Sequence, residues 1–177
     1  MTRSTIPLSA AVLFLLVNLS AHAQQQPDFT GTWTMDMSRS ESAAQGTDVS
    51  PRTPVTLIVR QSPADFNVET DRDGSKERLR FVFGQSSLAA PVGTAGRDAT
   101  AIEPAGVEWR GGDLITTTVY RVNGMPVKQV RTHRLAPTGR EMIVETRVEM
   151  QHGYESDHPE YKSGTVVTDV YTRTDHP

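Results

Sequence analysis

Alternation between apolar and polar residues runs through most of this chain and restricts its fold more than any other feature of the sequence. In residues 29–37, Phe29, Trp33 and Met35 alternate with threonine and aspartate. Successive side chains of a β-strand point to opposite faces, so this period of two predicts a strand with one buried face. The pattern returns along the chain, and no long segment has the 3.6-residue period of an amphipathic helix. The sequence therefore predicts an all-β protein.

Turn signals divide this pattern into strands. Asp73-Gly74 and Asn123-Gly124 tolerate the positive φ angles of a type I′ turn, and Pro137-Thr138-Gly139-Arg140 has the composition of a longer hairpin loop. The expected strands cover residues 29–37, 53–61, 65–70, 75–83, 100–109, 114–122, 125–136, 141–151 and 165–173. Connections that are mostly hairpins favour an antiparallel up-and-down barrel of about 8–10 strands. An open meander that closes by dimerisation is the alternative.

The longer connections have a different composition. Residues 38–54 are rich in Ser, Thr and Pro and predict a loop, while residues 84–99 are rich in Gly, Ala and Pro. A connection as long as 84–99 is typical of a lid or a disordered segment. Pro104 cannot donate a backbone hydrogen bond, so it predicts a bulge or an edge position in its strand.

The N-terminus has the pattern of a secretory signal. Arg3 precedes an apolar run at residues 10–19, and Ala21-His22-Ala23 matches the small-x-small motif of signal peptidase. The run is shorter than the roughly 20 apolar residues that span a bilayer. We expect residues 1–23 to be cleaved, leaving residues 24–177 as a single domain without a membrane span. The expected location is the bacterial periplasm or the extracellular medium.

Composition excludes several classes of function. The chain has no cysteine, which removes disulfide scaffolds, thiol nucleophiles and Cys-ligated metals. Its formal net charge of −3 does not indicate a nucleic-acid-binding surface. It contains no G-x-G-x-x-G, Walker or H-E-x-x-H motif, and no G-x-S-x-G context for a serine nucleophile. We therefore expect no cofactor and no metal site, including in the charged loop at residues 152–164.

Turn geometry also predicts which residues face each other. A two-residue turn at Asn123-Gly124 pairs Thr116 with Arg131, and a four-residue loop at 137–140 pairs Arg131 with Thr146. These two registers agree on one largely apolar face and on an opposite face where Lys128 meets Glu149. The apolar face is predicted to be the interior.

Polar residues on this interior face are the candidate ligand-binding site. They are Thr116, Thr118, Tyr120, Gln129, Arg131, His133 and Thr146. A buried arginine without a partner is costly, so Arg131 must meet a carboxylate, water or a ligand. Two interpretations remain open: pairing of Arg131 with an inward acid such as Asp169 or with water at the barrel mouth, and a ligand cavity with a polar end.

Four segments resemble small secreted bacterial lipocalin-like proteins of the calycin type. They are Asp28-Phe29-Thr30-Gly31-Thr32-Trp33, Trp109-Arg110-Gly111-Gly112-Asp113-Leu114, Leu135-Ala136-Pro137-Thr138-Gly139-Arg140-Glu141 and Val170-Tyr171-Thr172-Arg173. The first contains the G-x-W of lipocalin-like barrels, and Arg173 matches the arginine that covers this tryptophan. The resemblance implies a lipocalin-like barrel over residues 28–173, with structural roles for Gly31, Trp33 and Arg173.

Three functional hypotheses follow. The first is an exported barrel, monomeric or homodimeric, that binds a small amphipathic or anionic organic ligand in its interior. The second is a cofactor-independent isomerase, lyase or cyclase with His133 as general base, Asp169 as its orienting acid and Tyr120 as acid or hydrogen-bond donor. This arrangement requires that Asp169 faces inward, which the turn geometry does not determine. The third is an envelope interaction module that acts through loops 38–54 and 84–99.

Overall fold

The computed structural model describes residues 26–45, 50–85, 102–122, 125–150 and 164–174, and these form nine strands and one short helix. The strands are β1 (Gly31–Met35), β2 (Thr56–Gln61), β3 (Asp65–Arg72), β4 (Ser75–Val82), β5 (Glu103–Arg110), β6 (Asp113–Val122), β7 (Met125–Leu135), β8 (Glu141–Met150) and β9 (Val166–Arg173). The helix is α1 (Glu41–Ala44). The predicted all-β class is confirmed.

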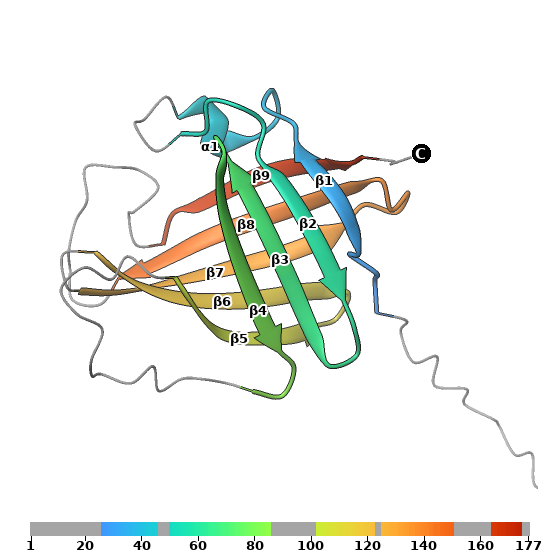
Figure 1. Ribbon diagram of the computed structural model, residues 1–177, viewed down its shortest axis with the longest axis vertical. Helices are drawn as coiled ribbons and strands as arrows, with labels where there is room; N and C mark the ends of the chain where they lie inside the picture. The colour runs from blue at the N-terminus through green and yellow to red at the C-terminus, as the bar shows by residue number, and fades with distance from the viewer. Residues whose placement is uncertain (1–25, 46–49, 86–101, 123–124, 151–163, 175–177) are drawn as a thin grey trace, which may run out of the picture.

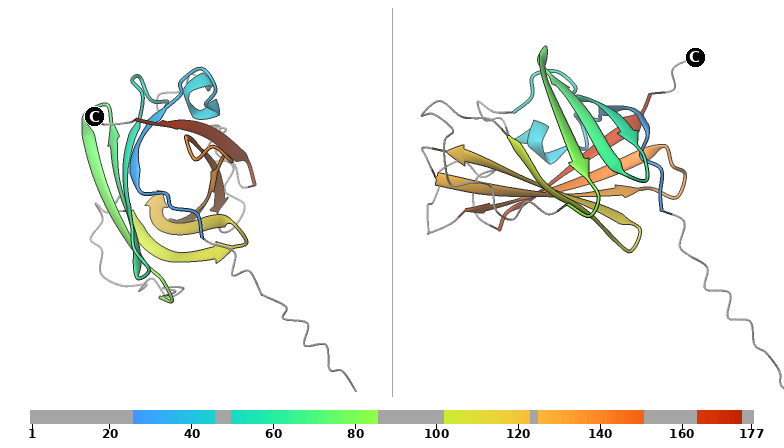
Figure 2. Two further views of the ribbon diagram at one scale, coloured as in Figure 1. Left: turned by 90° about the vertical axis from the view of Figure 1, so that its right-hand side faces the viewer. Right: turned by 60° about the horizontal axis from the view of Figure 1, so that its bottom comes forward.

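The nine strands form one antiparallel sheet that curls into a nearly closed barrel (Figure 1). Their order is β4-β3-β2-β1-β9-β8-β7-β6-β5, so the pairing of β1 with β9 joins the first and last strands of the chain. The two edge strands, β4 and β5, lie against each other without backbone pairing. Seen along the barrel, the strands curve around a common axis (Figure 2). The barrel is thus formed without strands from a second chain.

Aromatic side chains bridge the seam between β4 and β5 at one end. Phe83, directly after β4, stacks on Trp109 of β5 with ring centroids 6.2 Å apart and an interplanar angle of 9°. Phe29 lies against the same indole, with centroids 6.1 Å apart. Packing therefore replaces the missing ladder of hydrogen bonds at this end of the barrel.

The predicted hairpin registers are confirmed. Thr116 pairs with Arg131 across β6 and β7, and Arg131 pairs with Thr146 across β7 and β8. On the outer face, Lys128 Nζ donates to Glu149 Oε2 at 3.1 Å, as the register requires. The sheet also shifts register between Pro104 and Gly106, where the proline predicted a bulge.

The resemblance placed Gly31, Trp33 and Arg173 together, and the structure does the same. Trp33 is fully buried and donates through Nε1 to the carbonyl oxygen of Phe29 at 2.9 Å. The Arg173 guanidinium carbon lies 4.5 Å from the indole centroid, and its Nη2 donates to the carbonyl oxygen of Asp28 at 3.2 Å. Gly31 has φ of +150°, and a Cβ at this position would lie 3.6 Å from Arg173 Nε. That distance is an ordinary van der Waals contact, so the positive φ is what favours glycine here.

The prediction of an unbroken loop over residues 38–54 is wrong, because α1 forms within it. Glu41–Ala44 is a single turn whose stability comes from contacts with β9 rather than from intrinsic propensity. Ser40 Oγ accepts a hydrogen bond from the Val170 N–H at 3.0 Å, and Glu41 Oε2 accepts one from the Thr168 N–H at 2.7 Å. These side chains continue the pairing of β9 beyond the point where β1 ends.

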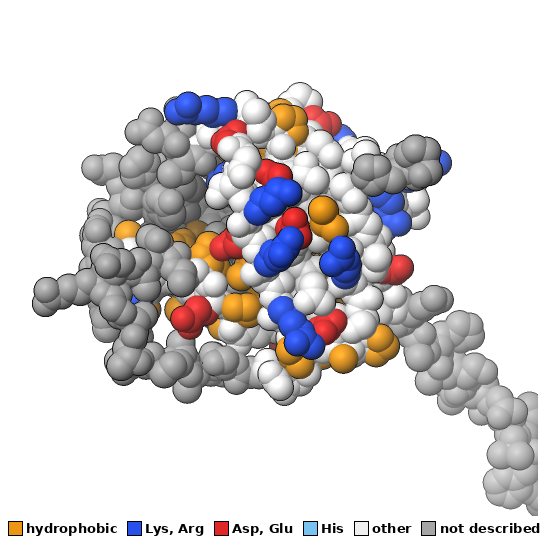
Figure 3. All heavy atoms as spheres, in the orientation of Figure 1, with side chains coloured by type: hydrophobic (Ala, Val, Ile, Leu, Met, Phe, Trp, Pro, Cys, Tyr) orange, Lys and Arg blue, Asp and Glu red, His pale blue; other side chains and the backbone are white. Residues whose placement is uncertain are grey.

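The outer face of β2, β3 and β4 carries opposite charges in cross-strand pairs (Figure 3). Arg78 Nε donates to Glu69 Oε2 at 2.8 Å, and Arg80 Nη2 lies 2.9 Å from Asp65 Oδ2. Exposed pairs of this kind contribute little stability individually. This surface is therefore a solvated exterior of paired charges.

Candidate functional site

A cavity of about 160 Å³ occupies the end of the barrel next to α1. Its walls come from β2, β3, β4, β6, β7, β8 and β9, and α1 and the segment before β2 also contribute. The residues that line it are Ser42, Gln45, Ser50, Val55, Leu57, Val68, Thr70, Arg72, Leu79, Phe81, Thr116, Gln129, Arg131, His133, Val144, Thr146, Val148, Val167, Asp169 and Tyr171. Apolar strand residues and a polar group of hydroxyls, guanidinium groups and one carboxylate therefore share this space.

Most of the predicted ligand-binding residues line the cavity. Thr116, Gln129, Arg131, His133 and Thr146 do so, on three neighbouring strands.

Thr118 and Tyr120 do not line the cavity, although the registers put them on the interior face. They lie further along β6, beyond the rung at which Thr116 meets Arg131. Thr118 is buried, and its Oγ1 has no hydrogen-bond partner among the described residues. Tyr120 is partly buried, opposite the buried Val127. Membership of the interior face therefore does not by itself place a residue in the cavity.

His133 lies where the cavity meets the aromatic core. Its side chain is buried, with the Phe66 ring 5.5 Å away and the Phe29 ring 6.2 Å away, centroid to centroid. Its Nε2 forms a hydrogen bond with Thr116 Oγ1 at 3.1 Å, while Nδ1 has no partner among the described residues. Desolvation lowers the pKa of His133 to about 3, and the positive charge of Arg131 acts in the same direction. The imidazole is therefore neutral at physiological pH.

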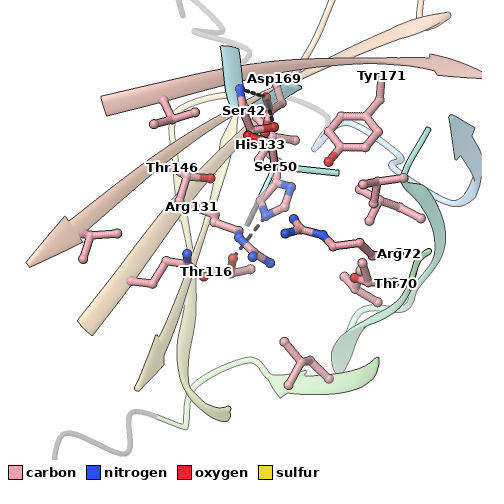
Figure 4. Close-up of a pocket in the computed structure, with 18 of the residues that line it drawn as sticks. Ser42, Ser50, Thr70, Arg72, Thr116, Arg131, His133, Thr146, Asp169 and Tyr171 are labelled. Atoms are coloured by element: carbon pink, nitrogen blue, oxygen red, sulfur yellow. Dashed lines mark hydrogen bonds between the residues drawn. The ribbon is translucent and has the colours of Figure 1, made fainter. Parts of the chain in front are cut away.

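Arg131 extends from β7 into the cavity (Figure 4). It forms no ion pair with any residue in the part of the chain that the structure describes. Arg72, at the end of β3, projects its guanidinium group into the same space from the opposite wall (Figure 4). The positive charge of Arg131, which no described carboxylate pairs with, favours an anion in this partly enclosed volume.

Asp169 faces inward, because β9 pairs it with Val144 of β8, whose side chain lies in the interior. Its Oδ1 accepts hydrogen bonds from the N–H of Ser42 at 3.1 Å and from Ser42 Oγ at 2.7 Å. The carboxylate therefore anchors the start of α1 to the barrel wall. Of the two predicted partners of this acid, neither His133 nor Arg131 is bonded to it in the described structure.

Sequence reasoning missed Arg72 and Tyr171. β3 was expected to end at residue 70 but continues to Arg72. The alternation of Phe66, Val68 and Thr70 would have placed Arg72 on the interior face. Tyr171 is two residues after Asp169 and follows it inward once the register of β9 is known.

The Tyr171 phenol lies in the field of the three charged residues that line the cavity. Burial raises its pKa above the ordinary value, and the nearby Asp169 carboxylate raises it further. Arg131 and Arg72 act in the opposite direction. Tyr171 is therefore a neutral hydroxyl at this site.

The three predicted catalytic residues are not assembled as a catalytic group. His133 is bonded to Thr116, Asp169 is bonded to Ser42, and Tyr120 lies outside the cavity. A general base near neutral pH has a pKa close to that pH, whereas the pKa of His133 is lowered to about 3. The geometry is suited to the binding of an anion or a hydroxylated group more than to proton transfer by this histidine.

The structure describes no metal site and no membrane-crossing helix. Over the described ranges, no group of three or more His, Cys, Asp or Glu residues is arranged to hold a metal ion. No helix in those ranges has the length and hydropathy needed to cross a bilayer. The expected signal segment at 1–23 and most of the connections at 84–99 and 152–164 lie outside the described residues.

Comparisons with known proteins relate the chain to others through its fold. No protein-family model matches the sequence, and no curated protein does. A secretary abundant heat soluble (SAHS) protein from Ramazzottius varieornatus has a similar structure, with a TM-score of 0.53 at 13% identity over 82% of this chain and 95% of that one.

Two further structures are similar to a lesser degree. Human cRBP IV gives a TM-score of 0.49 at 17% identity, over 84% of this chain and 99% of its own. A single-residue mutant of the fluorescent protein UnaG gives 0.48 at 16% identity, over 84% of this chain and 97% of its own. These neighbours are lipocalin-like and fatty-acid-binding-protein-like barrels. Together with the strand order, the similarity to the SAHS structure supports a lipocalin-like antiparallel β-barrel fold.

Proposed function

We propose that this protein is an exported barrel that binds a small organic anion, with an apolar portion, in its interior. The observation that carries the proposal is the Arg131 guanidinium inside the cavity, which has no carboxylate partner among the described residues. The acid expected to pair with it, Asp169, is hydrogen-bonded to Ser42 instead. A carboxylate or similar group on a ligand would supply the missing charge and accept the planar donors of the guanidinium group.

The rest of the cavity is complementary to an amphipathic molecule. Val144, Val148 and Val167 provide apolar wall on β8 and β9, while Thr116 and Thr146 flank Arg131 on neighbouring strands. An apolar pocket with a few convergent polar groups is typical of small-molecule sites. Barrels of this strand number have an interior large enough to hold one small ligand, which supports the same proposal.

Calorimetric titration with matched acids and alcohols tests the proposal. We expect benzoate and octanoate to bind, and benzyl alcohol and octanol to bind at least tenfold more weakly, since the alcohols lack the charge. Arg131→Met should weaken the binding of both acids at least tenfold and leave the binding of the alcohols unchanged. Arg147→Met, on the exposed outer face of β8, is the matched control and should change the affinity for neither the acids nor the alcohols. Equal binding of acids by the Arg131→Met variant would exclude the proposal.

The proposed location has its own experiment. Expression of the full chain in a bacterium, followed by fractionation and N-terminal sequencing, should give a mature protein in the periplasm or medium that begins at Gln24. A cytoplasmic product that retains residues 1–23 would contradict export without affecting the ligand proposal.

A further inference from the structure

Asp169 is the only acidic residue that is buried in the part of the chain that the structure describes. It lines the cavity from β9, and within the described ranges no lysine, arginine or histidine lies close enough to form an ion pair with it. Burial removes water from a carboxylate, which is costly unless an opposite charge and hydrogen bonds compensate. The described protein supplies Asp169 with hydrogen bonds but with no cation.

The hydrogen bonds of Asp169 leave part of its carboxylate unused. Both bonds from Ser42 go to Oδ1, at 3.1 and 2.7 Å, and no described residue donates to Oδ2. Because Asp169 lines the cavity, a donor located there can reach this second oxygen. A neutral donor would satisfy only its hydrogen-bonding capacity, whereas an ammonium group would donate a hydrogen bond and also compensate the charge.

Arg131 presents the opposite charge to the same cavity, and it also forms no ion pair with a described residue. On the outer face of the barrel, complementary charges meet directly, as Lys128 Nζ and Glu149 Oε2 do at 3.1 Å. Arg131 and Asp169 do not meet in this way. They are charges of opposite sign that share a cavity without forming an ion pair with each other.

Two further basic residues line the cavity, and neither forms an ion pair with Asp169 in the described structure. His133 is neutral, because desolvation, assisted by the charge of Arg131, lowers its pKa to about 3. Arg72 is exposed and has an interaction of its own within the protein. Arg131 is therefore the guanidinium group to which we assign the acid group of a ligand, and a cationic partner for Asp169 must come from the ligand itself.

The strand registers determine how far apart the two charges of such a ligand must be. Arg131 of β7 pairs with Thr146 of β8. Asp169 of β9 pairs with Val144, two residues before Thr146 on the same strand β8. Neighbouring strands are about 4.8 Å apart, so the backbones that carry the two charges are separated by roughly 10 Å. Both side chains line the cavity, so the acid and ammonium groups of a ligand that reaches both must lie at opposite ends of it (Figure 4).

The volume of the cavity restricts the size of that molecule. The cavity holds about 160 Å³, and an apolar protein cavity of roughly 150 Å³ accommodates one benzene molecule. A single six-membered ring with two short substituents is of the appropriate size. The apolar side chains of Val144, Val148 and Val167 line the same space and can contact such a ring.

We infer that the ligand is a small zwitterion, about the size of one ring, whose acid group binds Arg131 and whose ammonium group, at the opposite end of an apolar body, donates to Asp169. This inference rests on the proposed function and narrows it, since it adds a positive charge to the proposed organic acid. Each charge of the ligand then meets a group of opposite sign, and the open oxygen of Asp169 gains its donor.

Titration calorimetry at pH 7 with para-(aminomethyl)benzoate and para-ethylbenzoate tests this inference. The two acids have nearly the same shape and differ in that an ammonium group replaces a methyl group. In the unmodified protein we expect the zwitterion to bind at least tenfold more tightly, because only its ammonium group can pair with Asp169. Equal binding of the two acids, or tighter binding of para-ethylbenzoate, would overturn the inference.

Asp169→Asn assigns the preference to this residue, since it removes the charge but keeps an oxygen that can accept from Ser42. It should reduce the preference for the zwitterion to less than twofold and leave the affinity for para-ethylbenzoate unchanged. Glu149→Gln, which removes a negative charge from the outer face of β8, is the matched control and should keep the tenfold preference. A preference that survives in Asp169→Asn, or an equal loss of affinity for both acids, would show that Asp169 does not recognise the ammonium group.

Arg131→Met separates this inference from the proposed function. It should weaken the binding of both acids at least tenfold and leave the zwitterion preferred, because Asp169 is still present. If the two acids bind equally to the unmodified protein and both lose affinity in Arg131→Met, the anion proposal stands and the inference fails. If neither acid binds to the unmodified protein, both fail.

Discussion

The two ends of this barrel are built from the same strands but filled in opposite ways. At one end, Phe29, Trp33, Phe66 and Trp109 pack together, and all of these side chains except Trp109 are fully buried. At the other end, next to α1, a cavity of about 160 Å³ contains two arginines and an aspartate. The difference shows that the densely packed core and the proposed binding site occupy separate parts of one sheet.

His133 lies at the boundary between these ends, and its contacts show how sharply the environment changes. On one side the edges of Phe66 and Phe29 contact it, and on the other side is the cavity into which Arg131 projects. An aromatic core stabilises the fold through buried area and dense packing. Polar groups that lack partners destabilise the folded state unless a ligand satisfies them. The hollow end therefore depends on the filled end for its stability.

The largest expected effect is at the filled end. Trp33→Ala should lower the free energy of unfolding by about 3–5 kcal/mol, because it removes a fully buried indole and the surface on which Arg173 rests. Chemical denaturation monitored by circular dichroism measures this loss. Val148→Ala, at the cavity wall, is the comparison and should cost less, since this side chain borders empty space. An equal loss at both positions would remove the distinction between the two ends.

The next effect is a dependence of stability on pH at the boundary. The pKa of His133 is about 3 in the folded protein and about 6.5 when unfolded, so between these values the unfolded state binds more protons. Stability is therefore unaffected by this group above pH 6.5 and falls as the pH decreases towards 3. At pH 4 the protonation of His133 has lowered the free energy of unfolding by about 3 kcal/mol relative to pH 7.

Comparison with His133→Gln isolates this contribution, because the acidic residues titrate alike in both proteins. The difference in unfolding free energy between the two proteins should change by about 3 kcal/mol between pH 7 and pH 4. A difference that stays constant over this range would show that His133 is not desolvated in the folded protein, and that the boundary is open to water.

The sequence predicted most of the barrel because local turns determine most of its registers. Asn123-Gly124 and the loop at 137–140 each fix the pairing of a hairpin, and the alternation of side chains then separates the interior from the exterior. The register of β9 lacked such a signal. This strand pairs with β1 at the other end of the chain and with β8, and neither partner is joined to it by a short turn.

The candidate site was only partly predictable for a related reason. Arg131 and His133 were identified because they interrupt an apolar face within one hairpin. Arg72 and Ser42 enter the cavity from elements far away in sequence, β3 and α1. The position of α1 depends on hydrogen bonds between its side chains and β9, and a four-residue segment has no periodicity that predicts them. Tertiary contacts, not local propensity, assemble this half of the cavity.

A smaller effect of opposite sign is expected at the hollow end. Arg131→Met should raise the free energy of unfolding by about 1 kcal/mol, because it removes a charge that has no carboxylate partner among the described residues while keeping an apolar chain of similar length. Thermal unfolding without ligand measures this gain. Destabilisation by more than about 1 kcal/mol would instead show that Arg131 is held by a partner in the ligand-free protein, as in a buried ion pair.

The smallest effect distinguishes two threonines on alternate positions of β6. Thr118 Oγ1 is buried without a partner among the described residues, so Thr118→Val removes an unsatisfied hydroxyl and should raise the free energy of unfolding by about 0.5 kcal/mol. Thr116→Val removes the hydrogen bond to His133 Nε2 and should lower it by about 1 kcal/mol. Chemical denaturation of both variants gives the comparison. A loss of similar size in both would mean that ordered water satisfies Thr118, and that the wet part of the interior extends beyond the cavity along β6.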